Sequence, residues 1–286
     1  MPSITELTLY PIKSCAGIAV SEATMTAAGL RVGQVNDREW MLVTPQGQFI
    51  SQREYPQMAR IRCMIGAQHL QVDAPDMPPL YLPLQTTFLP KSDIKKRSVV
   101  IWEFALEADD CGDAVATWFS HYLGTACRLV RFSEDAQRYA NTKWTGDTLA
   151  PTRFSDGYPL LLISQASLDD LNEKSIQQGR APVPMNRFRP NIVVDGIEAF
   201  EEDYAESFAI RNQIQLRPVK PCPRCPMPAI DQETGIPGPS PVDILQAYRA
   251  NPIVDGEITF GMNVILDSGI GATIAVGDDV EITIAF

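Results

Sequence analysis

The stretch Arg217-Pro-Val-Lys-Pro-Cys-Pro-Arg-Cys-Pro-Met-Pro-Ala-Ile-Asp231 places two cysteines three positions apart, beside a lysine and two arginines. A strand predicted over Ile214–Val219 leads into it. The closely spaced prolines that follow predict an irregular loop, because proline lacks a backbone N–H and is poorly tolerated inside helices. Cationic neighbours stabilise a thiolate, which is both a nucleophile and a soft metal ligand. We therefore expect the chemistry of the protein at this loop.

The pair Cys222 and Cys225 has several interpretations. A thioredoxin-like dithiol needs its second cysteine inside a helix that the first one opens, and Pro226 and Pro228 oppose such a helix. A structural zinc site needs two further ligands, but the other cysteines and histidines form no second close pair. A loop that holds one thiolate toward a ligand with open coordination positions fits the residues better. Two cysteines that only fill space remain the alternative.

Composition sets the broad class. The chain has 286 residues, 45% hydrophobic and 21% charged, enough for one large or two ordinary cores of a soluble globular protein. Its net charge of −11 opposes a general nucleic-acid or anionic-membrane surface but leaves room for a local basic pocket. No signal-like segment opens the chain and no apolar run is long enough to span a bilayer. The expected location is the cytoplasm, with all six cysteines reduced.

The N-terminal part is predicted to contain short strands that form a small barrel or sandwich. These strands are predicted over Ile4–Tyr10, Trp40–Val43, Gln48–Ile50, Arg60–Ile65, His69–Val72 and Ser98–Phe104, with a proline-rich loop or sheet edge over Asp76–Pro90. A helix over Gly112–Leu123 follows from the apolar spacing of Val115, Trp118, Phe119 and Tyr122. After a strand over Cys127–Phe132, the polar segment Ser133–Gly157 predicts a boundary between domains of residues 1–130 and 131–286.

The second part alternates strands with a few helices. We predict strands over Tyr158–Ser164, Ile192–Val194, Glu257–Leu266 and Val280–Phe286. Ser167-Leu-Asp-Asp170 resembles a capping box for a helix that Gly179 closes, and Ser240 and Pro241 predict the start of a helix over Pro241–Arg249. The predicted fold class is therefore mixed α/β and mainly β.

Six motifs give the chain a resemblance to a known family. In order, they are Tyr10-Pro-Ile-Lys-Ser-Cys-Ala-Gly17, Asp37-Arg-Glu-Trp40, Ser155-Asp-Gly-Tyr-Pro-Leu160, Phe188-Arg-Pro-Asn-Ile-Val193, Lys220-Pro-Cys-Pro-Arg-Cys225 and Phe260-Gly-Met-Asn263. The chain resembles MOSC-domain proteins, most of all the YcbX-like branch related to the mitochondrial amidoxime reducing component. The resemblance implies an N-terminal β-barrel-like domain followed by a MOSC β-barrel domain with a few helices.

The resemblance also implies a cofactor and a set of site residues. The family binds molybdenum cofactor, a pterin with a phosphate tail and a metal-chelating dithiolene. Cys225 matches the thiolate ligand of the metal, Cys222 matches a cysteine that is not a ligand, and Asn263 matches a position that faces the metal pocket. The residues that match positions holding the pterin and phosphate are Lys13, Ser14, Arg38, Arg189 and Arg224, and less specifically Asp156, Gly157 and Tyr158.

The function implied is reduction of N-hydroxylated compounds such as amidoximes, hydroxylamines and N-hydroxylated bases. The alternative is a cofactor-binding or sulfur-carrier module without its own reductase activity. The sequence departs from the family after Cys225, where Met227-Pro-Ala-Ile-Asp-Gln232 replaces threonines, and at Pro223, which replaces a serine. Both changes remove hydroxyl donors near the expected cofactor.

We also expect a separate electron-donor protein of ferredoxin-like, flavin or haem type. The cysteines include no C-x4-C-x2-C run for a plant-type iron–sulfur cluster, and no G-x-G-x-x-G follows a strand. We expect no ferredoxin-like extension after Phe286. Neither nucleic acid nor a membrane is an expected partner.

Overall fold

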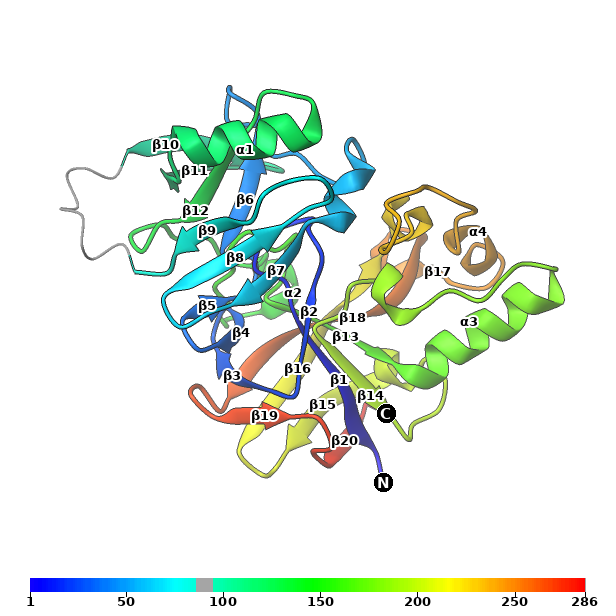
Figure 1. Cartoon of the computed structure of the whole chain (residues 1–286). Coiled ribbons are helices and arrows are strands. Elements are labelled where there is room, and N and C mark those ends of the chain that lie inside the picture. Colours follow the sequence, from blue (N-terminus) through cyan, green and yellow to red (C-terminus); the bar gives the residue numbers. More distant parts are fainter. Residues whose placement is uncertain (86–94, 286) are drawn as a thin grey trace.

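The computed structural model describes residues 1–85 and 95–285, and the chain is mainly β, as predicted (Figure 1). Within these residues the largest sheet has nine strands, eight of which form one hydrogen-bonded path. Their order is β2 (Ile18–Val20), β1 (Ser3–Leu9), β14 (Ile192–Asp195), β13 (Leu160–Ser164), β18 (Glu257–Ser268), β16 (Ile214–Pro223), β15 (Ala205–Ile210) and β20 (Val280–Ile284). The ninth, β17 (Ala250–Asn251), pairs with β18.

Three smaller sheets complete the β structure of the described residues. One has the order β10 (Lys96–Ile101), β11 (Phe104–Asp110), β12 (Arg128–Phe132) and β6 (Trp40–Val43). The second has the order β19 (Thr273–Ala275), β3 (Glu22–Thr26), β4 (Gly29–Val32) and β5 (Val35–Asn36), and the third β7 (Arg62–Ile65), β8 (His69–Asp73) and β9 (Leu80–Pro83). Strands from the two ends of the chain are thus neighbours, because β1 pairs with β14 and β19 pairs with β3.

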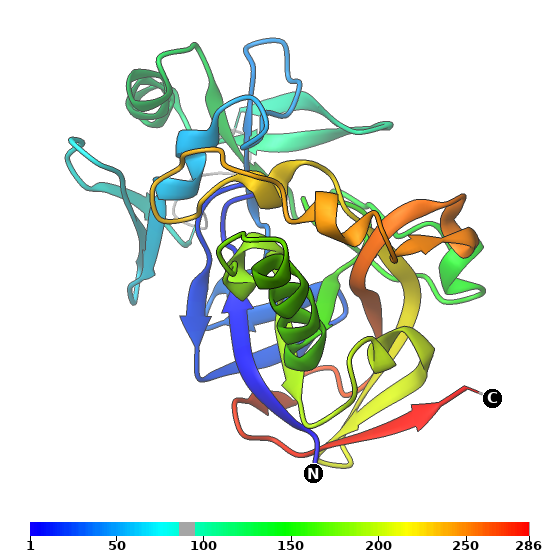
Figure 2. The same ribbon diagram turned by 90° about the vertical axis from the view of Figure 1, so that its right-hand side faces the viewer.

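The helices cover the outside of these sheets. α1 (Asp113–Leu123) packs beside β12, and α3 (Gln165–Gln177) lies against β13 and β14 (Figure 2). α2 (Thr142–Thr145) and α4 (Val242–Leu245) are single turns. Short 3-10 helices are η1 (Pro56–Arg60), η3 (Met185–Arg187), η4 (Glu201–Tyr204), η5 (Met227–Ala229) and η6 (Pro252–Val254). The predicted helix over Gly112–Leu123 is confirmed as α1.

The start of α3 differs from its prediction by one turn. Ser164, at the end of β13, is the N-cap, and its Oγ accepts a hydrogen bond from Ser167 N at 3.1 Å. The Ser167 hydroxyl instead donates to the buried Glu202 carboxylate at 2.8 Å, so the predicted capping box beginning at Ser167 is wrong. The tertiary contact with Glu202 uses the hydroxyl that local spacing assigned to the cap. Gly179 follows the helix with φ 71°, a left-handed conformation in which glycine carries no steric cost.

The predicted helix over Pro241–Arg249 is mostly wrong, since only Val242–Leu245 is α-helical. Ser240 Oγ accepts from Val242 N at 3.2 Å, as a cap would. Beyond this turn Ala247 N donates to Ile244 O and Tyr248 N donates to Leu245 O. These backbone hydrogen bonds join residues three positions apart, which is the spacing of a 3-10 helix. Pairing of Ala250 with β18 then requires an extended chain, which ends the helix.

Other local predictions also need correction. The strand over Ser98–Phe104 is divided between β10 and β11 by a turn at Trp102, whose φ is 54°. Gln48–Ile50 forms isolated bridges only. Asp76–Pro90, predicted as a loop or an edge, contains β9, an edge strand of its sheet, and its part from residue 86 lies outside the described residues, as does Phe286 at the end of the last predicted strand. The boundary at residue 130 stays a prediction.

Asp110 links the β10–β11–β12–β6 sheet to the start of α1. Its carboxylate accepts hydrogen bonds from Arg128 Nε at 2.6 Å, Arg97 Nε at 2.9 Å and Gly112 N at 2.8 Å. Burial acts to raise its pKa, but the hydrogen bonds from Arg128 and Gly112 outweigh it and lower the pKa of Asp110 to about 2. The native state therefore favours the ionised carboxylate more than the unfolded chain does.

We predict that Asp110→Asn lowers the free energy of unfolding by about 1–2 kcal/mol at pH 6. Because the native pKa lies below the unfolded value of about 3.9, this stabilisation is present above pH 4 and is lost as the pH falls toward 2. Urea titrations between pH 6 and pH 3 measure it, with the exposed Asp113, which also pairs with Arg128, changed to Asn as the control. An equal deficit at both pH values contradicts the prediction.

Candidate functional site

One cavity of about 120 Å³ brings together every residue predicted for the site. We call it the Cys225 cavity. It is lined by Lys13, Ser14, Arg38, Ser155, Asp156, Gly157, Tyr158, Leu160, Leu161, Phe188, Arg189, Asn191, Cys222, Pro223, Arg224, Cys225, Met227 and Asn263. These residues come from six separate segments. Five of them adjoin β1, β13, β14, β16 and β18, which are neighbours in one sheet, and the segment of Arg38 is joined to the chain after β1 by a bridge between Ile12 and Trp40.

The cavity is lined by backbone in an unusual conformation. Ser14 has φ 64°, Arg38 has φ 47° and Arg189 has φ 58°. Left-handed backbone costs a residue with a side chain of order 1–3 kcal/mol and is held only where surrounding contacts enforce it. Here Arg38 N donates to Tyr10 O at 2.6 Å, and Ser14 O accepts from Gln52 Nε2 at 2.8 Å. Strain gathered in this way is typical of binding sites.

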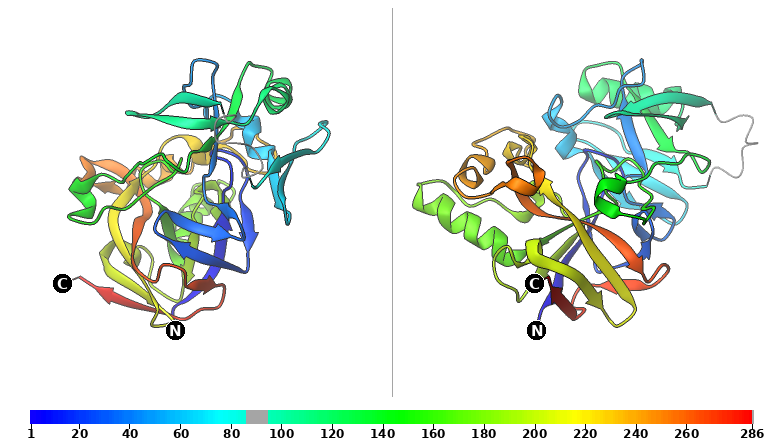
Figure 3. Two further views of the ribbon diagram at one scale, coloured as in Figure 1. Left: turned by 90° about the vertical axis from the view of Figure 1, so that its left-hand side faces the viewer. Right: turned by 180° about the vertical axis from the view of Figure 1, so that it is seen from behind.

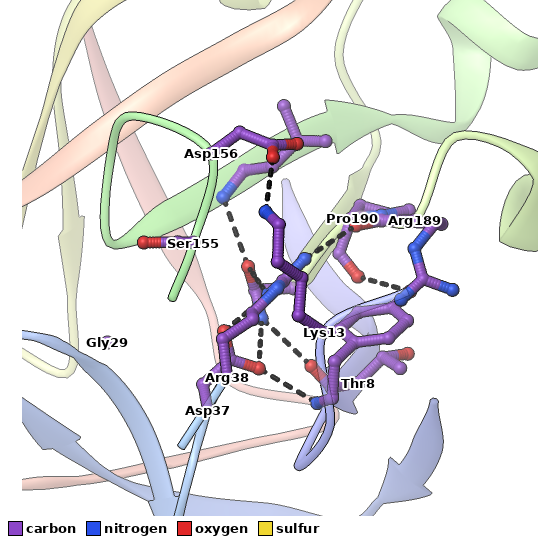
Figure 4. A network of polar contacts seen from close by, with 12 residues as sticks. Thr8, Lys13, Gly29, Asp37, Arg38, Ser155, Asp156, Arg189 and Pro190 are labelled. Carbon is purple, nitrogen blue, oxygen red and sulfur yellow. Dashed lines mark hydrogen bonds and ion pairs between the residues drawn. The ribbon is translucent and has the colours of Figure 1, made fainter. Parts of the chain in front are cut away.

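Two arginines flank the ring of Tyr10. The guanidinium carbons of Arg38 and Arg189 each lie 4.3 Å from its centroid, so the two cations are fixed close together. Figure 4 shows both arginines and Lys13 converging from different loops. Arg38 is also held by polar partners, since its Nη1 donates to the Asp37 carboxylate and to Asn191 Oδ1 at 2.8 Å. Asp37 is buried and accepts from Tyr10 N at 2.8 Å.

In the part of the chain that the structure describes, Arg189 has no carboxylate partner. It is 9% exposed, and among the described residues its guanidinium donates one hydrogen bond, from Nη1 to Gln232 Oε1 at 3.4 Å. Burial lowers the pKa of Arg189. Removing a cation from water without a counter-charge is costly unless a ligand compensates for it. Arg189 is therefore suited to bind an anion.

Lys13 is the third cation of the cavity. It is 5% exposed, its Nζ pairs with the Asp156 carboxylate, and the Phe49 ring lies 5.5 Å away. Burial lowers the pKa of Lys13, which the Asp156 charge opposes. With Arg224, the lining of the cavity has four cationic side chains and one carboxylate, that of Asp156, and the Asp37 carboxylate binds Arg38 outside the lining. The cavity therefore has a local excess of positive charge, although the net charge of the whole chain is −11.

The cysteine segment is partly a strand, which corrects the predicted loop. β16 continues through Cys222 to Pro223 beside β18 (Figure 3), with register shifts between Pro218 and Lys220 and between Pro221 and Pro223. The shifts accommodate the prolines, which lack the N–H that a regular ladder needs. Cys225 lies beyond the strand and is exposed. No helix opens at Cys222, so the geometry does not support the thioredoxin-like interpretation.

Arg224 orients the end of this segment. Its backbone N donates to Ile258 O at 2.8 Å, its Nη2 to Phe188 O at 2.8 Å and its Nη1 to Cys222 Sγ at 3.2 Å. The Cys222 sulfur is therefore already engaged, whereas Cys225 makes no such contact with any described residue. All six cysteines are free thiols.

Asn263 and Tyr158 complete the lining. Asn263 lies on β18 opposite Lys220, and its Nδ2 donates to Lys220 O at 3.2 Å. Tyr158 is buried with Ala140, Ala150 and Ile265, and burial raises its pKa to about 12. The Tyr158 phenol is therefore neutral at pH 7, and Tyr158 also lines the cavity.

The side chains that line the Cys225 cavity fit a ligand that already contains a metal ion and most of the atoms that coordinate it. Among residues 1–85 and 95–285, no group of three or more histidine, cysteine or carboxylate side chains is placed to hold a metal ion. The Cys225 cavity offers one exposed thiol beside several cations. Such a set suits an anionic, metal-chelating molecule that needs one additional soft ligand.

Three residues of this arrangement were missed in the sequence. Asp37 and Asn191 lie inside the quoted motifs beside Arg38 and Arg189, so their positions were available, but their role depends on contacts across the fold. Arg138, in the predicted connection, holds the loop of Asp156 through backbone carbonyls. Nothing in its local sequence points to this contact.

The comparisons with known proteins agree with this geometry. Residues 1–126 match the MOSC N-terminal beta barrel domain family, and residues 150–281 match the MOSC domain family. Mitochondrial amidoxime reducing component 2 of Rattus norvegicus is 37% identical over 261 residues, covering 86% of this chain and 72% of the relative. Mitochondrial amidoxime-reducing component 1 of Homo sapiens is 32% identical over 288 residues, covering 97% and 82%.

These names correct one expectation. The relatives are called mitochondrial, which contradicts the predicted cytoplasmic location. Within the described ranges, none of the helices has the length and apolar character needed to cross a bilayer.

Both domain matches occur in the predicted order, and the relatives align with most of the chain. The chain therefore belongs to the family of MOSC-domain proteins with an N-terminal MOSC β-barrel domain, to which the amidoxime reducing components also belong.

Proposed function

We propose that this protein is an oxidoreductase that uses molybdenum cofactor to reduce N-hydroxylated compounds, amidoximes among them. The observation that carries the proposal is the Cys225 cavity, where one exposed thiol stands beside buried cations. Relatives at 37% and 32% identity are named amidoxime reducing components, which supports the reaction class. Reduction of an N–OH group to N–H consumes two electrons and two protons and releases water.

Each group of residues has a part in the proposal. Cys225 supplies the soft thiolate, and Arg38, Arg189 and Lys13 hold the anionic tail through charge-assisted hydrogen bonds. When bound, a dithiolene-chelated molybdenum supplies a centre able to take an oxygen atom from nitrogen. Asn263 lines the same cavity, and its Nδ2 is bonded to Lys220 O, which leaves its Oδ1 as the amide atom able to accept a hydrogen bond from a ligand. Asp37 and Asn191 fix Arg38, so the tail meets donors that are already oriented.

We predict that Cys225→Ala abolishes reduction of an amidoxime while the fold is kept, because the only exposed cavity thiol of the described residues is removed. Cys222→Ala, in which Arg224 loses a sulfur acceptor, is expected to have a much milder effect. Activity with a dithionite-reduced viologen dye measures both, and circular dichroism checks the fold. Equal loss in the two variants, or a disulfide between these cysteines in active protein, contradicts the single-thiolate proposal.

We further predict that Arg189→Ala and Arg38→Ala lower cofactor retention. Each removes about 1.5–3 kcal/mol of charge-assisted bonding, which is roughly tenfold or more in affinity. Molybdenum and pterin content after purification measure the loss. Arg217→Ala is the matched control, because Arg217 pairs with Asp267 and does not line the cavity. Wild-type content in both cavity variants shows that the assignment of these arginines is wrong.

A separate protein is proposed to deliver the electrons. The relatives are named components, and the cysteine spacing provides no plant-type cluster site.

We predict that protein loaded with molybdenum cofactor turns over an amidoxime with a reductase–ferredoxin pair or with reduced viologen, but not with NADH or NADPH alone. Sustained turnover with the nicotinamide alone contradicts the partner requirement. No turnover even with the dye favours the cofactor-binding or sulfur-carrier alternative.

A further inference from the structure

Arg138 is a buried cation that contacts the site loop from behind. It is 3% exposed, and its guanidinium lies 4.8 Å from the Phe104 ring centroid. Its Nη1 donates to Ser155 O at 2.6 Å and to Arg153 O at 2.9 Å, and its Nη2 donates to Asp156 O at 2.7 Å. Within the described ranges it makes no ion pair with a carboxylate. Its Nη1 also donates to Thr152 Oγ1 at 3.2 Å, and its other hydrogen bonds all go to backbone carbonyls of one loop.

These carbonyls determine where the neighbouring N–H groups point. In a planar trans peptide the C=O and the N–H point in opposite directions. The Ser155 carbonyl shares its peptide with Asp156 N, and the Asp156 carbonyl shares its peptide with Gly157 N. Because Arg138 attracts both oxygens to one side of the loop, both N–H groups are turned to the other side. Arg138 does not line the Cys225 cavity, whereas Asp156 and Gly157 do.

The two N–H groups are available to a ligand. Neither donates a hydrogen bond to an acceptor in the described parts of the chain. Space beside Gly157 is open, since a Cβ built there would meet nothing within 4 Å. Successive backbone N–H groups that face one concavity bind anions. The side chains of Lys13, Arg38 and Arg189 line the same cavity, so these donors face a positively charged space.

We propose that Arg138 is a positioning residue, which holds the Ser155 and Asp156 carbonyls so that the backbone N–H groups of Asp156 and Gly157 bind a phosphate-type anion in the Cys225 cavity. The inference rests on the proposed function only for the identity of the natural ligand, the tail of the cofactor. The positioning depends on the planar, forked shape of the guanidinium as well as on its charge, because this one group donates to several carbonyls at once. A lysine keeps the charge but not this geometry.

The first test uses inorganic phosphate as the probe on cofactor-free, isotope-labelled full chain. The amide NMR resonances of Asp156 and Gly157 are expected to shift with phosphate in the wild type. In Arg138→Met the apparent dissociation constant from these shifts is expected to rise about tenfold or more, and in Arg138→Lys by an intermediate amount. Arg153→Met is the matched control, since Arg153 lies in the same loop and its guanidinium donates to none of these carbonyls in the described structure.

Thermal unfolding of the same proteins separates loss of fold from loss of binding, and Arg138→Lys keeps the test valid if Arg138→Met does not fold. Absence of phosphate shifts at Asp156 and Gly157 in the wild type overturns the inference. Equal dissociation constants in wild type and folded Arg138 variants also overturn it.

The second test uses protein purified from a host that makes the cofactor. The inference is supported if the purified wild type contains molybdenum and pterin and the Arg138 variants have lost most of both. Full retention in these variants overturns it. A wild type that shows the phosphate shifts yet carries neither molybdenum nor pterin leaves the inference standing and refutes the proposed function.

Discussion

The buried pairing of Asp37 with Arg38 and Asn191 is the interaction on which the site depends. Asn191 donates to Thr8 O and to Asp37 Oδ1, both at 3.1 Å, and accepts from Arg38 and from Leu161 N. These bonds connect β1, the turn before β6, the start of β13 and the approach to β14. Burial raises the pKa of Asp37, and Arg38 and the backbone N of Tyr10 oppose this. The buried carboxylate is compensated by three donors, the Tyr10 backbone N, Arg38 Nη1 and Asn191 Nδ2.

The same network explains why cations gather in an acidic chain. Arg38 has a carboxylate, Lys13 has the Asp156 carboxylate of a neighbouring loop, and Arg189 is left with one weak amide contact. All three side chains line the cavity, and Arg189 is the one whose charge is least compensated by protein groups in the described structure. Positive φ values at Ser14, Arg38 and Arg189 show that the backbone is held in costly conformations to present these side chains. A bound anion would offset the cost of burying the charges.

The thiol side of the cavity is built differently, from a strand that cannot pair regularly. Pro218, Pro221 and Pro223 have no N–H to donate, so β16 shifts register against β18 where it approaches the cavity. These shifts end the pairing just before Cys225, which is left exposed, while Cys222 is held inside the strand by Arg224. Two cysteines close in sequence thereby acquire different surroundings. This difference supports separate roles for them, with Cys225 as the thiol available to a ligand.

The sequence by itself determined the mainly β class, α1, and most of the strands, such as β1 with its apolar alternation and β6 with its continuous apolar run. It also located the site residues through short motifs, and all of them line one cavity. It did not determine how hydroxyls and turns are used: Ser167 bonds Glu202 instead of capping α3, and Trp102 divides one predicted strand into two. The partners of Arg38 and Arg138 likewise depend only on tertiary structure. Periodicity and capping are set by residues a few positions apart, whereas Asn191 reaches Asp37 across 154 positions, through a sheet order that no local pattern contains.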